Sequence, residues 1–122
     1  MTNDGASPSR TARLESLDRS GRGFYVVSAK LPKEELFGLQ SQMRRAAVSV
    51  AANIAEGSAR HSTAELIQFL YIANGSLSEL DTHLEIAARL GYVESPQNLR
   101  EQLDDVQGQV LAVIQSLKRR SR

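Results

Sequence analysis

Apolar residues recur at alternating steps of four and three residues along most of this 122-residue chain. That spacing gathers apolar side chains on one face of an α-helix, and it predicts an all-α fold. No segment shows the two-residue alternation typical of a half-buried strand. We call each apolar face a seam, and the clearest seam consists of Leu66, Leu70, Ala73, Leu77, Leu80, Leu84 and Ala87.

Capping residues define the bounds of the helix that carries this seam. Ser62 and Glu65 have the spacing of a capping box, in which each side chain satisfies a free backbone N–H group. Gly91 suits the left-handed backbone position that follows many helix ends. These signals predict a helix over residues 63–90.

Two further helices have the same rhythm. Ser95 is a favourable N-cap and Pro96 a favourable first residue, so a helix is predicted over residues 96–120. Another is predicted over residues 34–57, after Pro32. The seam of the helix over 96–120 is Leu99, Leu103, Val106, Val110, Val113 and Leu117. The seam of the helix over 34–57 is Leu39, Met43, Ala46, Val50, Asn53 and Gly57.

The first part of the chain has a weaker pattern. Residues 1–9 have no apolar periodicity and are expected to form a disordered leader. A first helix is predicted over residues 10–31, or only from residue 24, because Gly21 and Gly23 each cost roughly 1 kcal/mol of helix stability relative to Ala. Its seam consists of Leu14, Leu17, Gly21, Phe24, Ser28 and Leu31.

Four helices joined by short connections predict an antiparallel, up-down-up-down, left-handed four-helix bundle. Connections of only a few residues force consecutive helices to run antiparallel as neighbours. We expect residues 10–122 to form this single domain, since a chain of this length fits one domain.

Composition narrows the chemistry. The chain has no Cys, which excludes disulfides, thiol catalysis and cysteine zinc sites. It has no signal-peptide pattern and no run of about 18 apolar residues. We therefore expect a soluble, cytoplasmic protein that does not span a membrane.

Charge is unevenly distributed along the chain. Residues 1–61 hold nine basic and six acidic residues, a net of +3, whereas residues 62–117 hold two basic and eight acidic residues, a net of −6. The four basic residues of the tail restore the overall +1. One half of the chain can therefore attract the other, within a subunit or between subunits.

Asn53, Glu56 and Gly57 form a polar motif at the end of an apolar helix. A buried amide in a seam fixes helix register. Glu56 lies near the helix end, where the dipole disfavours a carboxylate, so we expect it to have a specific partner, such as Arg60 four residues on or backbone N–H groups. Catalysis would require an acid–base or nucleophilic partner, and the sequence supplies none. We interpret the motif as structural, and we expect no enzyme activity, no cofactor and no small-molecule substrate.

Metal binding is not expected either. Four-helix bundles can hold two metal ions on repeated Glu-x-x-His pairs. The only two histidines pair with glutamates at a spacing of four, in Glu79–His83 and His61–Glu65, and neither matches that motif.

The helix over residues 63–90 is apolar on nearly every side near its start. A helix of this kind is buried on every side, and in a small chain a second subunit can supply the cover. The alternative is that the first helix of the same chain covers it. The residues expected at an oligomer interface are Ile67, Phe69, Tyr71, Ile72, Gly75 and Ser76.

Residues 37–92 resemble a known family. The stretches "FGLQSQMRRA", "NIAEG", "GSLSEL" and "LGY" follow the pattern of four-helix-bundle proteins encoded in 23S rRNA intervening sequences. That family is similar in fold to the accessory protein of diversity-generating retroelements, and both form ring-shaped homopentamers. The retroelement protein binds nucleic acid and its reverse transcriptase. The resemblance therefore implies a pentamer and carries over no catalytic residue.

The chain departs from the family pattern in two places. Ala51 stands where the family usually has Pro, which weakens any kink in that helix. Leu14 stands where Trp is usual, and residues 20–23 interrupt an expected apolar stretch.

Two functions fit these observations. The first is a non-enzymatic, homo-oligomeric, pentameric scaffold that binds RNA or DNA through basic patches repeated around a ring, since phosphate contacts add up across copies. The alternative is an oligomeric adaptor that binds a protein partner and has no nucleic-acid role. The residues expected to contact phosphates are Arg44, Arg45, Arg60, Lys118, Arg119 and Arg120.

Overall fold

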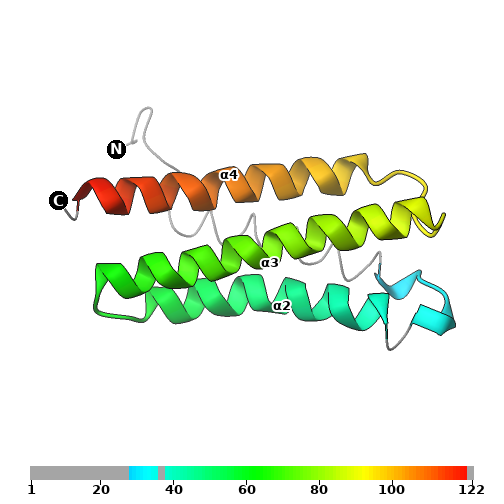
Figure 1. The fold of residues 1–122 in the computed structure, drawn as a ribbon, viewed down its shortest axis with the longest axis horizontal. Coiled ribbons are helices and arrows are strands. Elements are labelled where there is room, and N and C mark those ends of the chain that lie inside the picture. Colours follow the sequence, from blue (N-terminus) through cyan, green and yellow to red (C-terminus); the bar gives the residue numbers. More distant parts are fainter. Residues whose placement is uncertain (1–27, 36–37, 121–122) are drawn as a thin grey trace, which may run out of the picture.

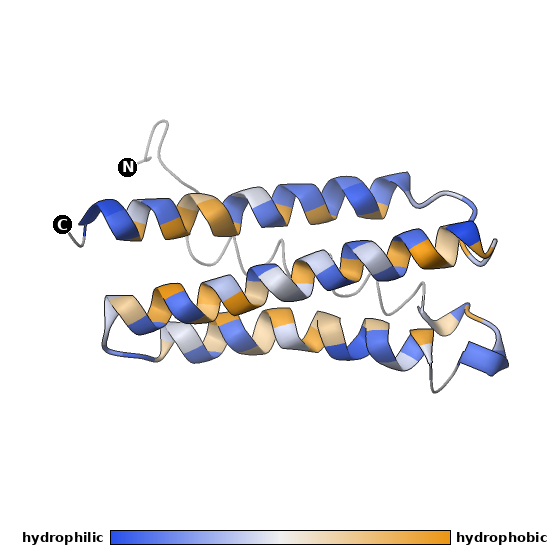
Figure 2. Ribbon diagram, in the orientation of Figure 1, coloured by the Kyte–Doolittle hydropathy of each residue, from blue (hydrophilic) through white to orange (hydrophobic). Residues whose placement is uncertain are grey.

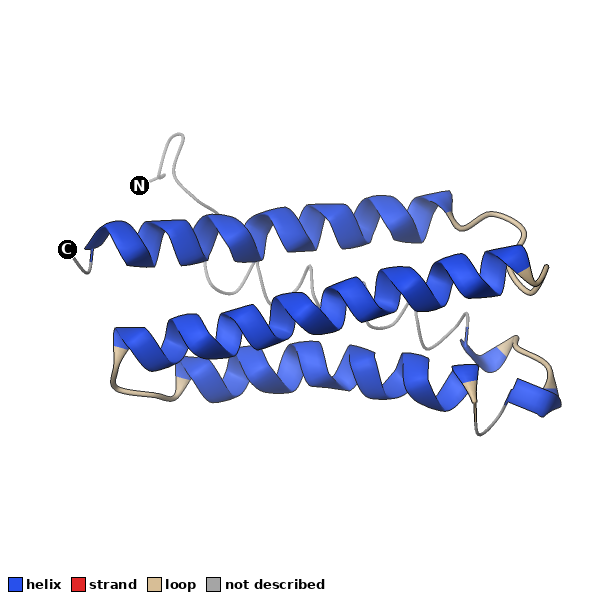
Figure 3. Ribbon diagram, viewed as in Figure 1, coloured by secondary structure: helices blue, strands red, loops and turns tan. Residues whose placement is uncertain are grey.

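The computed structural model describes residues 28–35 and 38–120. Within these ranges it contains a short 3-10 helix, η1 (Lys33–Glu35), and three long α-helices, with no strand. The long helices are α2 (Leu39–Ser58), α3 (Thr63–Arg89) and α4 (Gln97–Arg120). They lie side by side and run antiparallel in turn, with α3 packed against both α2 and α4 (Figures 1 and 3). This part of the chain is all-α, as the seams predict.

The leader predicted at residues 1–9 and most of the predicted first helix lie outside the described residues. Of that helix, Ser28 and Ala29 are helical, and Ser28 and Leu31 are buried at two of its predicted seam positions. Gln40 donates to the carbonyl oxygen of Ser28 at 2.8 Å, so this segment is fixed against the start of α2.

Helix α2 begins five residues later than the position predicted from the sequence. Pro32 is followed by the single turn of η1, and Gly38 precedes the helix with φ −102° and ψ −107°, which are not helical values. The Glu35 carboxylate accepts from the backbone N–H of Leu39 at 3.4 Å. A glycine in an unusual backbone conformation thus separates two segments that residue periodicity alone joins into one helix.

The ends of α3 match their sequence signals. The backbone N–H of Glu65 donates to the Ser62 hydroxyl at 3.3 Å, as the N-cap requires. At the other end Gly91 has φ +79° and, with Tyr92, donates back to the carbonyls of Ala88 and Ala87. This is the Schellman arrangement, which needs a residue tolerant of positive φ.

The core consists mainly of the seam residues predicted for α2, α3 and α4. Met43, Leu84 and Leu103 are almost fully buried at seam positions. Near the end of α4, however, Ile114 is fully buried while Val113 is only partly buried. A straight α-helix has 3.6 residues per turn. An apolar face with a period of 3.5 residues therefore drifts around the helix by about 20° in each heptad. Figure 2 shows the resulting hydrophobic and hydrophilic bands along each helix.

Arg100, near the start of α4, links this helix to the last turns of α3. It donates to Glu85 at 2.7 Å and lies 3.8 Å from Asp81. Glu85 also accepts from Arg89 at 2.7 Å, and hydrogen bonds from Arg89 and Arg100 lower the pKa of its carboxyl group. None of the described helices is both long and apolar enough to cross a membrane.

Candidate nucleic-acid interface

The polar motif at the end of α2 is divided between two structural tasks. Asn53 donates to the backbone carbonyl and the hydroxyl of Ser49, at 2.8 and 3.0 Å. The Ser49 hydroxyl in turn forms a 2.9 Å hydrogen bond with Ser76 of α3. Asn53 is half-buried, and the hydroxyl of Ser49 connects it to Ser76 of α3.

Gly57 allows α3 to approach α2 closely. A Cβ atom at this position would lie 2.7 Å from Cβ of Phe69 and 3.1 Å from Cδ1 of Leu66, closer than packed carbon atoms come. Phe69 therefore occupies space that only glycine leaves open.

Glu56 and Arg60 cover the same junction from outside. The Arg60 guanidinium donates to the Glu56 carboxylate at 2.6 Å and lies 3.8 Å from that of Glu65. Its carbon Cζ is 5.1 Å from the centroid of the Phe69 ring, a cation–π distance. The ion pair expected between Glu56 and Arg60 is present, and both residues are exposed.

Four of the six arginines and lysines expected to contact phosphates lie at one end of the molecule. Arg60 is in the α2–α3 turn, and Lys118, Arg119 and Arg120 form the end of α4, which lies beside the start of α3 (Figure 1). We call these four residues the basic end. In the described chain, Arg119 and Arg120 are exposed and form no ion pair. They are therefore available to bind an anion.

Arg44 and Arg45 lie elsewhere. Arg45 is 15 residues before Arg60, about 22 Å along the helix at 1.5 Å per residue. Arg44 is half-buried and donates to the Ser28 hydroxyl at 2.8 Å, whereas Arg45 is exposed. Consecutive residues on a helix point about 100° apart, so these two side chains lie on different sides of α2. Arg44 thus acts within the chain.

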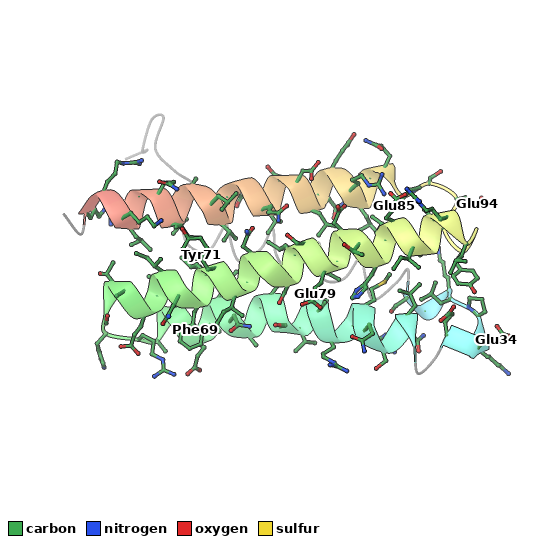
Figure 4. The ribbon with its side chains drawn as sticks, in the orientation of Figure 1. Glu34, Phe69, Tyr71, Glu79, Glu85 and Glu94 are labelled. Carbon is green, nitrogen blue, oxygen red and sulfur yellow. The ribbon has the colours of Figure 1, made fainter. Side chains whose placement is uncertain are left out.

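The residues expected at an oligomer interface point to different sides of α3. Phe69 lies toward α2 and Tyr71 toward α4 (Figure 4). Ile72 and Gly75 are exposed, with no heavy atom within 4 Å of a Cβ built on Gly75. Ser76 is buried in a single chain, because its hydroxyl bonds Ser49 of α2. Ser76 therefore offers no surface to a second subunit.

Ile67, the sixth of these residues, is partly buried against the core. Together with Phe69 it belongs to the packing of a single chain more than to its surface.

A further aromatic contact lies beside the basic end. Lys118 places its Nζ atom 5.2 Å from the centroid of the Tyr71 ring, which is 42% exposed. Periodicity could not predict this contact, because the two residues are 47 positions apart. Periodicity could not predict the pairing of Arg60 with Phe69 either, because it joins the α2–α3 turn to the next helix.

Neither histidine lies in a cluster of possible metal ligands within the described structure. No group of three His, Cys, Asp or Glu side chains with metal-ligand geometry occurs in residues 28–35 and 38–120. His83 is half-buried, and its burial lowers its pKa, an effect that the carboxylate of Glu79 partly opposes.

Comparisons with known proteins agree with this picture of a helical protein. A search of curated proteins finds no match. A crystal structure of a protein of unknown function from the S23 ribosomal protein family of Bacteroides thetaiotaomicron is similar in fold, with a TM-score of 0.69. The two sequences are 22% identical, and the match covers 84% of this chain and 98% of the other.

The family model for 23S rRNA-intervening sequence proteins matches residues 21–112. This match extends the resemblance of residues 37–92 in both directions and confirms it. The chain therefore belongs to the 23S rRNA-intervening sequence protein family.

Proposed function

We propose that this protein is a homo-oligomeric four-helix-bundle scaffold that binds RNA or DNA through its basic end. The basic end carries the proposal, because Arg119 and Arg120 are exposed without an ion pair in the described chain and directly follow Lys118. Phosphate binding by such groups is independent of sequence and sensitive to salt. The competing explanation is that basic residues merely compensate the negative end of the α4 dipole.

In the proposed bundle, the fourth helix would come from the segment predicted as helical over residues 10–31, or only from residue 24. Two observations support this. Ser28 and Leu31 are buried at its predicted seam positions. In addition, α2 and α4 both pack on α3, and among the described residues no Cα atom of α2 lies within 8 Å of one in α4. A fourth helix between α2 and α4 would complete an up-down-up-down bundle.

An outward surface on α2 and α3 supports self-association. The Ser49–Ser76 hydrogen bond marks the line where these helices meet. One turn toward the basic end lie Ala52 and Ile72, both exposed, with Ile72 at 51%. We define the outer α2–α3 face by its exposed residues of small or apolar type, Val48, Ala52, Ala55, Ile72 and Gly75.

Charges beside this face also favour a second copy. One turn away from Ser49 and Ser76 in the other direction lie Arg45 and Glu79. Both are exposed, and neither forms an ion pair in the described chain. Opposite charges left unpaired beside an apolar surface can pair across an interface. Five copies in a ring, the number implied by the family resemblance, would repeat the basic end five times and increase avidity.

A protein-binding adaptor is the second candidate, and the same apolar face favours it. The face would then bind another protein in place of a second copy of this chain.

Fluorescence anisotropy of a labelled structured RNA and a matched DNA duplex tests the proposal. The full-length protein is titrated at low and near-physiological salt. We expect the affinity to fall steeply as the salt concentration rises. On a duplex, each phosphate contact should contribute about −0.9 to the slope of log K against log salt concentration. The variant Arg119→Gln/Arg120→Gln should lower that slope by about 2 for the duplex.

Arg89→Gln is the matched control, since Arg89 is an exposed arginine at the opposite end of the molecule. It should change binding little, and light scattering should show one oligomer mass for all variants. Absence of binding at low salt would reject the nucleic-acid role and favour the adaptor.

A further inference from the structure

Two aromatic rings lie near the basic end, and they differ in access. Phe69 is covered by Arg60, which Glu56 holds with a 2.6 Å ion pair. Tyr71 is 42% exposed, and its one described ring contact is with Lys118, at 5.2 Å. Lys118 is itself exposed and has no carboxylate partner in the described chain. In the described chain, the part of the Tyr71 ring that faces Lys118 is therefore covered by a long, flexible side chain that a ligand can displace.

The surroundings of Tyr71 continue along the line where α3 and α4 meet. Gln107 of α4 donates to Ser78 of α3 at 3.0 Å, which places these two residues on that line. Leu111 is one turn after Gln107 and is 40% exposed. Tyr71, Leu111 and Lys118 thus form a strip with an apolar part and a cation, and Arg119 and Arg120 follow directly.

An exposed ring beside several cations is the combination that binds unpaired nucleotides. A base stacked on an aromatic side chain contributes about 1–3 kcal/mol, and every base has a face that can stack. Bases inside a duplex have both faces covered by their neighbours, so they have no free face that could stack on the Tyr71 ring. The cations bind the phosphates of either form.

We propose that Tyr71 stacks on an unpaired base, and that the basic end therefore prefers single-stranded nucleic acid to a duplex. In the bound form the base takes the place of the Lys118 ammonium over the ring, and Lys118 turns to a phosphate. This inference rests on the proposed function, and the experiment below separates the failure of one from the failure of the other.

The experiment compares three labelled probes of equal length: oligouridine, oligothymidine and a mixed-sequence DNA duplex. Each is titrated with wild-type protein, Tyr71→Leu and Tyr71→Phe at one fixed salt concentration. We expect Tyr71→Leu to weaken binding of both single strands roughly 5- to 100-fold and to leave the duplex unchanged. Tyr71→Phe keeps the ring and should retain binding. Tighter binding of oligouridine would identify RNA as the ligand, and equal binding would identify either strand.

Several results would overturn the inference. An equal loss on all three probes, or none on the single strands, would show that the ring does not stack on a base. A change in oligomer mass for Tyr71→Leu would instead place Tyr71 in a subunit interface. In these cases, duplex binding by the wild-type protein leaves the proposed function intact, whereas failure of the wild-type protein to bind any probe rejects both.

Discussion

At the scale of single residues, the two glycines of α2 and α4 have opposite effects. Gly57 is buried where a Cβ would lie 2.7 Å from Phe69, whereas nothing lies within 4 Å of a Cβ built on Gly108. A glycine in a helix costs roughly 1 kcal/mol relative to alanine, so a close packing contact explains Gly57, whereas none among the described residues explains Gly108.

We expect Gly57→Ala to destabilise the protein by about 1–3 kcal/mol, because the added methyl group forces α2 and α3 apart. Gly108→Ala is the control and should stabilise by about 1 kcal/mol through helix propensity alone. Urea denaturation followed by circular dichroism measures both. Equal effects of the two substitutions would mean that α2 and α3 do not approach closely at Gly57.

His83 should make stability depend on pH. Burial lowers its pKa below the 6.5 of an exposed histidine, with Glu79 acting in the opposite direction. The unfolded chain therefore binds a proton more readily than the folded protein does. The free energy of unfolding should fall as the pH drops from 6.5 through the lower folded pKa.

His83→Gln should flatten this dependence in urea titrations between about pH 5 and pH 8, the range over which histidine changes charge. His61→Gln removes the other, exposed histidine and should leave the dependence as it is. An unchanged slope in His83→Gln would assign the pH effect to other groups.

At the scale of elements, periodicity and capping residues predicted most of the fold. The seams of α2 and α3 and the ends of α3 follow from spacing and from Ser62 and Gly91, because these are local signals. The start of α2 did not follow, since it depends on the backbone angles of Gly38. Ile114 is buried in the core because a straight helix drifts relative to a 3.5-residue repeat. A strict heptad pattern does not include this drift and therefore predicts Val113 instead.

The candidate site was less predictable than the fold. The sequence shows that Lys118–Arg120 end a helix, and an ion pair from Glu56 to Arg60 follows from their spacing. It does not show that Tyr71 meets Lys118 or that Arg44 turns to Ser28, because both contacts join different elements. Contacts between elements depend on how the helices are placed in space.

Arg44 and Arg45 should therefore behave differently when replaced. Arg44→Ala should lower the free energy of unfolding by about 1–3 kcal/mol, because the hydrogen bond from the charged guanidinium to the buried Ser28 hydroxyl is lost. Arg45→Ala should change stability by less than about 0.5 kcal/mol, as exposed positions usually do. Thermal or urea denaturation distinguishes them. A large loss in Arg45→Ala alone would contradict the assignment.

At the scale of the whole molecule, the outer α2–α3 face and the basic end are separate surfaces. Ile72→Glu should dissociate the proposed oligomer, since an interface would bury an unpaired charge at a cost of several kcal/mol. Leu111→Glu is the control, because Leu111 is also exposed but lies at the α3–α4 line. Light scattering gives the mass of each. An oligomer that survives Ile72→Glu unchanged would place the interface elsewhere.

The position of α3 between α2 and α4 has a consequence for how the native state opens. Within the described chain α2 packs more extensively on α3 than α4 does, and no Cα atom of α2 lies within 8 Å of one in α4. Amide hydrogens should exchange with solvent earliest along α4, as one cooperative unit, while α2 and α3 stay protected. The open, mid-helix Gly108 adds to this weakness. Lys118, Arg119 and Arg120 then belong to the unit that detaches at the lowest free energy, and a bound polyanion would slow its exchange.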